Sequence, residues 1–139
     1  MTRAKRNHRL NHIFRENGKT LIVAMDHASV FGTMDGLENP GEVIQQVRSG
    51  GADAILTTFG LGKQFVKEIG DMGLILRVDG GLSALAAEWG PLRLVYQVQD
   101  ALRLGADAVG AMGMPGSRFE AQMLPYLSEV ISQCAEWNM

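Results

Sequence analysis

The sequence predicts an α/β fold in which about four strand–helix units build one parallel sheet. Short apolar runs that end in polar residues alternate with helical patterns along the 139 residues. Continuous apolar runs are typical of strands buried on both faces. One five-residue phrase also occurs twice, at Gly51-Ala52-Asp53-Ala54-Ile55 and Gly105-Ala106-Asp107-Ala108-Val109, 54 positions apart. Regular alternation of strand and helix implies a parallel sheet with right-handed crossovers.

The repeated phrase marks the passage from a helix into the next strand. We expect its glycine to end the helix at C′ in a left-handed conformation. The small alanines then let the chain enter the sheet closely. The two copies are two units apart, so one unit averages about 27 residues. A complete (β/α)₈ barrel of the TIM type needs about 250 residues, and the chain therefore corresponds to a half or truncated barrel.

The expected elements follow in order. Apolar runs predict strands at Thr20–Met25, Ala54–Thr58, Leu74–Val78 and Ala108–Met112. Helices are expected after Asn39-Pro40, over Lys63–Ile69, over Val98–Leu104 and beyond a capping box formed by Ser117 and Glu120. Residues 82–96 read as an extended active-site loop. A doubly wound sheet is the alternative, but it usually carries a glycine-rich phosphate loop after its first strand. Asp26-His27-Ala28-Ser29 stands there instead, which favours the barrel.

Composition points to one globular domain over residues 1–139. Hydrophobic residues make up 46% and charged residues 20%, with a net charge of −2. No apolar run reaches the 18 residues of a membrane span, and no signal peptide is seen, so we expect a cytoplasmic protein without a membrane partner. The lone Cys134 excludes an internal disulfide and a cysteine-based zinc site.

Residues 1–19 form a basic arm, with six Lys or Arg against one acid. Such an arm can contact nucleic acid. Leu10, Ile13 and Phe14 are spaced as in a short helix that docks on the domain, however, and no nucleic-acid motif is present. We therefore expect a docked N-terminal helix and no nucleic-acid partner. His8 and His12 lack the intervening Glu of a zinc-protease helix, so no metal site is expected.

Polar residues that end the predicted strands are the candidate site. Asp26 ends the first strand, at the rim where barrel enzymes carry catalytic groups. An Asp that only caps the following turn is the structural alternative. His27 either orients a substrate or holds the loop. Thr58 and Asp79 occupy the equivalent positions in the second and third units, although Asp79-Gly80-Gly81 is first of all a turn signal.

Several motifs, in order, resemble one family over almost the whole chain. They are Arg9 to Phe14, Gly18-Lys19-Thr20 leading to Val23-Ala24-Met25-Asp26-His27, Gly50 to Gly60, Asp100 to Val109, and Gly116-Ser117-x-x-Glu120. Together they resemble the archaeal-type class I fructose-bisphosphate aldolases and their relatives, the aminodideoxyheptulosonate synthases and the autoinducer-2-phosphate thiolase.

The resemblance implies a (β/α)₈ lyase that makes or breaks carbon–carbon bonds of sugar phosphates through a lysine Schiff base, without a cofactor. It makes Asp26 the catalytic carboxylate beside the imine. Substrate-binding roles are then expected for His27, Thr58, Asp79, Met114 and Gly116. The imine lysine belongs to the sixth strand of that family, and Lys5, Lys19, Lys63 and Lys67 fall on the arm, a turn or a helix face. We therefore expect the chain alone to be inactive.

One departure from the family concerns Met114. Members with true aldolase activity often have a tyrosine proton donor there, and a thioether cannot donate a proton. This favours a phosphorylated substrate other than fructose bisphosphate. The helix start at Ser117 can hold an anion, although a plain helix-capping role explains this serine as well.

The alternative function is a non-catalytic half-barrel that self-associates, because four strands leave two open edges and an uncovered lumen. A homo-oligomer is expected in either case.

Overall fold

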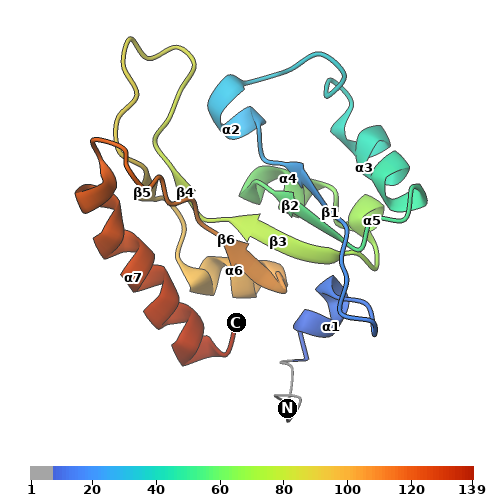
Figure 1. Cartoon of the computed structure of the whole chain (residues 1–139). Helices are drawn as coiled ribbons and strands as arrows, with labels where there is room; N and C mark the ends of the chain where they lie inside the picture. Colours follow the sequence, from blue (N-terminus) through green and yellow to red (C-terminus); the bar gives the residue numbers. More distant parts are fainter. Residues whose placement is uncertain (1–7) are drawn as a thin grey trace.

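A single parallel sheet organises the chain. The computed structural model describes residues 8–139, and in it the strands are ordered β1-β2-β3-β6 (Figure 1). The strands are β1 (Ile22–Met25), β2 (Ala54–Thr57), β3 (Gly73–Arg77) and β6 (Ala108–Gly110). All three pairings are parallel. The order follows the sequence without a reversal, whereas a doubly wound sheet changes direction next to its first strand. This confirms the barrel-type α/β fold of about four units.

Seven helices accompany this sheet within residues 8–139. They are α1 (Leu10–Ile13), α2 (Ala28–Phe31), α3 (Pro40–Ser49), α4 (Phe59–Gln64), α5 (Val66–Ile69), α6 (Val98–Leu104) and α7 (Glu120–Trp137). Figure 1 shows α3 and α7 at opposite flanks of the sheet. None of the helices in this described part has both the length and the hydropathy to cross a membrane.

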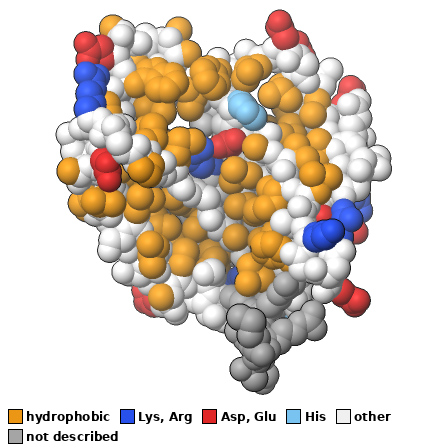
Figure 2. Space-filling view, viewed as in Figure 1, with side chains coloured by type: hydrophobic (Ala, Val, Ile, Leu, Met, Phe, Trp, Pro, Cys, Tyr) orange, Lys and Arg blue, Asp and Glu red, His pale blue; other side chains and the backbone are white. Residues whose placement is uncertain are grey.

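The two faces of the sheet differ in burial. Ile55 and Leu76 are completely buried on one face, together with Ile44 of α3 and Val98 of α6. Because strand side chains alternate between faces, the neighbours of these residues along the strands point the other way. On that second face, which we call the lumen face, a Cβ at Gly110 would meet the side chains of Leu56 and Ile75. Figure 2 shows hydrophobic side chains spread over the face seen in this view, around a basic and an acidic group.

Several local predictions were wrong. The helix expected over Lys63–Ile69 is two short helices separated at Phe65, whose φ of −113° and ψ of 35° are not helical. A Cβ at Gly41 of α3 would come within 2.9 Å of the Phe65 ring, so packing of this ring accompanies the break.

The loop over residues 82–96 has little regular structure, as predicted. It contains one strand of two residues, β5 (Arg93–Leu94), which pairs antiparallel with β4 (Asp79–Gly80).

The predicted capping box at Ser117 is also wrong. The Glu120 carboxylate accepts a hydrogen bond from the Gly116 N–H at 2.8 Å, not from the Ser117 N–H. The Ser117 hydroxyl accepts from Phe119 N–H at 3.3 Å. Gly116 has φ of 78°, which turns its N–H toward the first turn of α7. The reciprocal box occurs instead at Gln97 and Asp100, at the start of α6.

The repeated phrase performs the same task twice. Gly51 and Gly105 have φ of 86° and 85°, which confirms the left-handed helix ends. The following aspartates bind the start of another strand. Asp53 accepts from Leu21 N–H at 2.7 Å, and Asp107 accepts from Leu74 N–H at 3.0 Å. Each phrase is therefore a helix stop followed by a carboxylate that joins two strands at their N-terminal ends.

The same two carboxylates hold the N-terminal segment. Arg15 Nε lies 2.6 Å from Asp53 Oδ1, and His12 Nδ1 lies 2.6 Å from Asp107 Oδ1. Ile13 is 3% exposed, and a Cβ at Gly73 would meet the His12 carbonyl at 2.8 Å. The segment thus docks at the N-terminal ends of the strands. This fits the docked helix expected within the arm of residues 1–19, of which residues 1–7 lie outside the described residues.

We predict that Asp107→Ala destabilises the domain by about 1–3 kcal/mol, because it leaves the partly buried Leu74 N–H without an acceptor. Asp107→Asn is the matched control, because its carboxamide oxygen can still accept that bond although the charge facing His12 is lost. Urea denaturation of both variants measures the difference. An equal loss in the two variants would show that the contact with His12, and not the strand junction, carries the effect.

Candidate active site at the C-terminal strand ends

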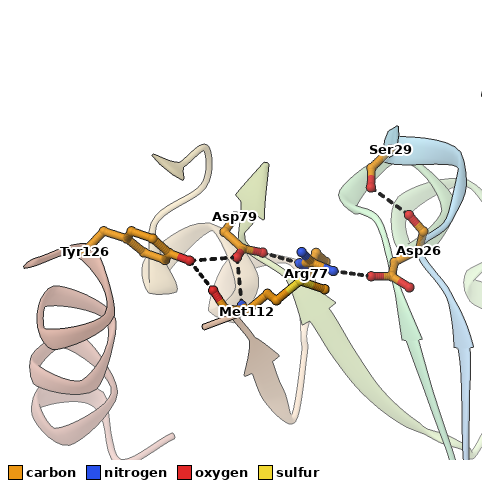
Figure 3. Close-up of polar contacts among 6 residues, drawn as sticks. All are labelled: Asp26, Ser29, Arg77, Asp79, Met112 and Tyr126. Carbon is orange, nitrogen blue, oxygen red and sulfur yellow. Dashed lines mark hydrogen bonds and ion pairs between the residues drawn. The ribbon is translucent and has the colours of Figure 1, made fainter. Parts of the chain in front are cut away.

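Three charged side chains meet at the C-terminal ends of β1 and β3. Arg77 is the last residue of β3, Asp26 follows β1, and Asp79 begins β4 (Figure 3). Arg77 Nη1 donates to Asp26 Oδ2 at 2.6 Å, and Arg77 Nε donates to Asp79 Oδ1. The guanidinium therefore bridges two carboxylates that are 53 positions apart in the sequence. We call these three residues the mouth triad.

The mouth triad is withdrawn from solvent. The exposed fractions of its side chains are 11% for Asp26, 10% for Arg77 and 0% for Asp79. Burial by itself lowers the pKa of Arg77, but the hydrogen bonds and charges of Asp79 and Asp26 outweigh it and raise that pKa. Arg77 therefore stays cationic. Two carboxylates facing one guanidinium make this end of the sheet rich in hydrogen-bond acceptors.

Asp79 is held from two further directions. Its Oδ2 accepts from the Met112 N–H at 2.7 Å, and the Tyr126 hydroxyl of α7 lies 3.1 Å from the same oxygen (Figure 3). The Tyr126 hydroxyl also contacts the Met112 carbonyl. Burial, followed by the charge and hydrogen bond of Asp79, raises the pKa of Tyr126 to about 12. Both oxygens of Asp79 are therefore engaged within the protein, so this carboxylate positions Arg77 and the segment that follows β6.

Asp26 keeps one oxygen outside these bonds. Oδ2 binds Arg77, whereas no hydrogen bond to Oδ1 is found within residues 8–139. Its backbone carbonyl accepts from the Ser29 hydroxyl at 2.7 Å, which fixes the first turn of α2 (Figure 3). The predicted turn-capping alternative would place the carboxylate on backbone N–H groups. Instead the carboxylate faces Arg77, and Asp26 lies behind the pocket described next, whose lining includes Arg77 but not Asp26 itself.

A pocket of about 450 Å³ opens beside the mouth triad. Its volume lies within the usual range for small-molecule sites. It is lined by residues that follow β1, β2 and β3, and by the segment after β5: Ala28, Ser29, Thr58, Phe59, Gly60, Arg77, Asp79, Gly80, Gly81, Val95 and Tyr96. We call it the mouth pocket. Side chains from three successive units converge there, as expected for the C-terminal rim of a barrel.

The other predicted site residues have different positions. Thr58 lines the mouth pocket, and its hydroxyl also accepts from Leu61 N–H at 3.3 Å, so it caps α4. His27 is exposed at the start of α2 without a side-chain capping bond. Met114 does not line the mouth pocket; it lines a separate hollow of about 360 Å³ with Trp89 and Phe119. The substrate-binding roles of these residues stay predictions.

Gly116 serves the start of α7. It lies in the turn before that helix, where its positive φ and its hydrogen bond to Glu120 shape the backbone. It does not line the mouth pocket. Its predicted contact with a substrate stays a prediction.

Sequence reasoning missed Arg77, Tyr96 and Tyr126. A signal existed for Arg77, because a charge inside an apolar strand, two positions before Asp79, shares a face with that carboxylate. Tyr126 stands between Met123 and Val130 on the buried stripe of α7, and nothing in this pattern distinguishes it from a core aromatic. Tyr96 reaches the pocket because of the course of the irregular segment before it, which no local pattern predicts.

Among residues 8–139, no group of three His, Cys, Asp or Glu side chains is gathered closely enough to hold a metal ion.

A singly wound parallel sheet with buried carboxylates at its C-terminal ends is the arrangement of (β/α)₈ barrel enzymes. Comparison with known proteins defines the class further. The family described as DeoC/LacD family aldolase matches residues 20–139, and the chain belongs to this family of aldolase-type lyases.

Individual relatives agree with this assignment. The chain is 34% identical over 130 residues to the 2-amino-3,7-dideoxy-D-threo-hept-6-ulosonate synthase of Halobacterium salinarum, covering 94% of the chain and 48% of that protein. It is 29% identical over 133 residues to the class 1 fructose-bisphosphate aldolase of Thermoproteus tenax, covering 91% of the chain and 49% of that protein. The chain thus spans about half the length of the curated relatives it matches.

Solved structures give the same picture. An archaeal fructose-1,6-bisphosphate aldolase, with its catalytic Lys covalently bound to the carbinolamine intermediate of the substrate, superimposes with a TM-score of 0.81 at 27% identity. The match covers 94% of this chain and 53% of the aldolase. A fructose-bisphosphate aldolase from Slackia heliotrinireducens, 14% identical with a TM-score of 0.70, shares the fold.

We predict that Arg77→Met destabilises the domain by about 3–5 kcal/mol, because it leaves two buried carboxylates without their cation. Arg48→Met is the matched control, since Arg48 pairs with the exposed Asp71 and its loss should change stability little. Urea unfolding at neutral pH compares the two variants. If Arg77→Met were no more destabilising than Arg48→Met, the triad would not be an electrostatic unit.

We predict that stability falls at alkaline pH because of Tyr126. The pKa of an unfolded tyrosine is about 10, whereas that of folded Tyr126 is about 12. Below pH 10 the phenol is neutral in both states, and its contribution is complete. Between about pH 10 and 12 only the unfolded chain loses this proton, so the free energy of unfolding falls by roughly 3 kcal/mol. Tyr126→Phe should lack this component of the fall.

Absorbance of the phenolate at 295 nm provides the direct measurement for that prediction. The chain has two tyrosines, Tyr96 and Tyr126, so substitution assigns each step. The step near pH 12 should vanish in Tyr126→Phe. Its persistence in that variant would contradict the assignment.

Proposed function

We propose that this chain is part of a class I, Schiff-base aldolase-type lyase that acts on a phosphorylated sugar or a related keto compound. The observation that carries the proposal is the buried carboxylate of Asp26, held by Arg77 with one oxygen open, beside a pocket at the C-terminal strand ends. The family assignment supports the reaction type. Two of the solved relatives are fructose-1,6-bisphosphate aldolases, which act on a sugar bisphosphate.

The chemistry assigns a specific task to Asp26. In an imine-forming lyase, a lysine amine condenses with the substrate's keto group and water leaves. Cleavage then needs a base that takes the proton from the hydroxyl on the departing carbon. That carbon leaves as an aldehyde, and the electron pair of the broken bond moves into the imine to form an enamine. The open oxygen of Asp26 is suited to take that proton or to position that hydroxyl.

We do not expect any of the four lysines in this sequence to form the imine. Lys19, Lys63 and Lys67 are exposed, and none of them lines the mouth pocket. Lys5 lies outside the described residues. We propose that the lysine comes from a strand that completes the barrel, so that this chain alone is inactive.

Met114 stands where members of the family with true aldolase activity often have a tyrosine proton donor. This difference favours a substrate other than fructose bisphosphate.

Three broader properties belong to this proposal. We expect the whole protein to serve carbohydrate metabolism, to be cytoplasmic and to form a homo-oligomer. Neither a nucleic acid nor a cofactor is required by the proposed chemistry.

A second candidate function is a non-catalytic half-barrel that associates with itself. The exposed apolar residues around the lumen favour it, because Ile22 and Met112 are each 41% exposed. Within residues 8–139, β1 and β6 each have only one paired neighbour in the sheet, so both edges are open. A chain that dimerises and never forms a covalent adduct would support this candidate.

We predict that the longest natural reading frame containing this sequence is trapped by borohydride in the presence of fructose 1,6-bisphosphate or a related keto sugar phosphate. The adduct should lie on a lysine other than Lys5, Lys19, Lys63 or Lys67. Asp26→Asn should lower the rate of bond cleavage by about 10²–10⁴-fold, the usual contribution of a general acid or base. Peptide mass spectrometry and a cleavage assay measure the two effects.

Cys134→Ala is the control for that experiment, since Cys134 lies on α7 and does not line the mouth pocket. An adduct on one of these four lysines would overturn the proposed origin of the imine. Full activity of Asp26→Asn would overturn the role of the carboxylate.

A further inference from the structure

The charged groups at the mouth pocket hold one another. Arg77 binds Asp26 and Asp79, and Asp79 also contacts Met112 and Tyr126. These bonds use two of the five N–H groups of Arg77, so the guanidinium can still donate to an anionic part of a ligand. The neutral polar groups of the lining are a second source of recognition.

Tyr96 is a neutral lining residue whose hydroxyl is not used within the protein. Within residues 8–139 its hydroxyl has no hydrogen-bond partner, although the residue is only partly exposed. Its ring stacks on Phe59 with a centroid distance of 4.8 Å and an interplanar angle of 14°. Its backbone N–H donates to the Val78 carbonyl at 3.0 Å. The phenol is thus held from its ring and from its backbone, while its hydroxyl remains available to a ligand.

Two aliphatic hydroxyls of the lining also retain hydrogen-bonding capacity. The Ser29 hydroxyl donates its hydrogen to the Asp26 carbonyl, so its oxygen can still accept. The Thr58 hydroxyl accepts from the Leu61 N–H, so its hydrogen can still be donated. With Tyr96, the pocket offers three hydroxyl groups of complementary character.

An aromatic wall accompanies these hydroxyls. Phe59 and Tyr96 line the same pocket as stacked rings, next to Val95. A ligand with oxygens along one side and C–H groups along the other matches both features. A polyhydroxylated carbon chain or ring has that pattern, whereas a purely apolar ligand would leave the hydroxyls without partners.

We propose that Tyr96 contacts the substrate in the mouth pocket, where its hydroxyl hydrogen-bonds an oxygen of a polyhydroxylated ligand that packs against the wall of Phe59 and Tyr96. The inference deepens the proposed function and rests on it for the position of the substrate. It concerns binding and not the chemical step. Ser29 and Thr58 supply the two further hydroxyl contacts.

The test is a titration of the isotope-labelled 139-residue chain with fructose 1,6-bisphosphate, used as a probe for polyhydroxylated keto sugar phosphates and not as the proposed natural substrate. Binding is followed by NMR through the amide signals of Gly60, Gly80 and Gly81. Tyr96→Phe keeps the ring and its stacking and removes only the hydroxyl. It should weaken binding about three- to tenfold, the effect of one neutral hydrogen bond. Trp137→Phe, a change outside the pocket that also removes a polar group from an aromatic side chain, should bind as the unmodified chain does.

Two further arms make the result decisive. In the unmodified chain, the Cζ carbon signal of Tyr96 should move on titration, because that carbon carries the hydroxyl. Inorganic phosphate alone should produce no shift that depends on Tyr96. If phosphate reproduced the Tyr96-dependent shifts, the ligand class would be wrong. Absence of shifts at the three glycines, or equal affinity of Tyr96→Phe and Trp137→Phe, would overturn the inference.

Failure of this inference is distinguishable from failure of the proposed function. The titration reports binding without bond cleavage, whereas borohydride trapping and Asp26→Asn report the reaction. Trapping that succeeds while Tyr96→Phe binds normally would remove Tyr96 and leave the lyase assignment. Tyr96-dependent binding without any trapped adduct would keep the pocket and remove the Schiff base.

Discussion

The guanidinium of Arg77 is the interaction on which the candidate site depends. From the end of β3 it joins the end of β1, through Asp26, to the start of β4, through Asp79. Asp79 in turn contacts the segment after β6 and α7. Five segments of the sheet and its surroundings therefore meet at one buried electrostatic unit. Buried ion pairs of this kind add little net stability over apolar packing, but losing one partner is costly. The arrangement thus specifies a geometry more than it adds stability.

The two ends of the sheet divide their tasks. At the N-terminal ends, Asp53 and Asp107 join strands and hold the segment that carries His12 and Arg15. These two carboxylates have structural roles. At the C-terminal ends, Asp26 retains an oxygen without a partner beside a pocket. At that end Asp79 is bonded within the protein, whereas Asp26 keeps one oxygen without a bond. This difference between the two ends agrees with the division between stability and catalytic faces in barrels.

Much of the fold could be predicted from local patterns. The helix over Val98–Leu104 was predicted with the bounds that the structure has, and all four strands were predicted to within one or two residues. The left-handed glycines at the two helix ends were also predicted correctly. Within the site, Asp26, Thr58 and Asp79 were predicted at strand ends, and the structure brings them to one rim. The break at Phe65 and the hydrogen bonds of Glu120 were missed, since they depend on packing against α3 and on the turn at Gly116.

The sequence by itself determined the class of fold and the end of the sheet at which polar groups collect, because strand length, glycine placement and apolar runs are local properties of the chain. Only the tertiary structure decided which polar groups act together. Arg77 and Asp26 are 51 positions apart, and Tyr126 is 47 positions from Asp79. No local pattern encodes such pairings. They arise because parallel strands align their C-terminal ends at one rim, where burial excludes water and leaves each charge to find its partner within the protein.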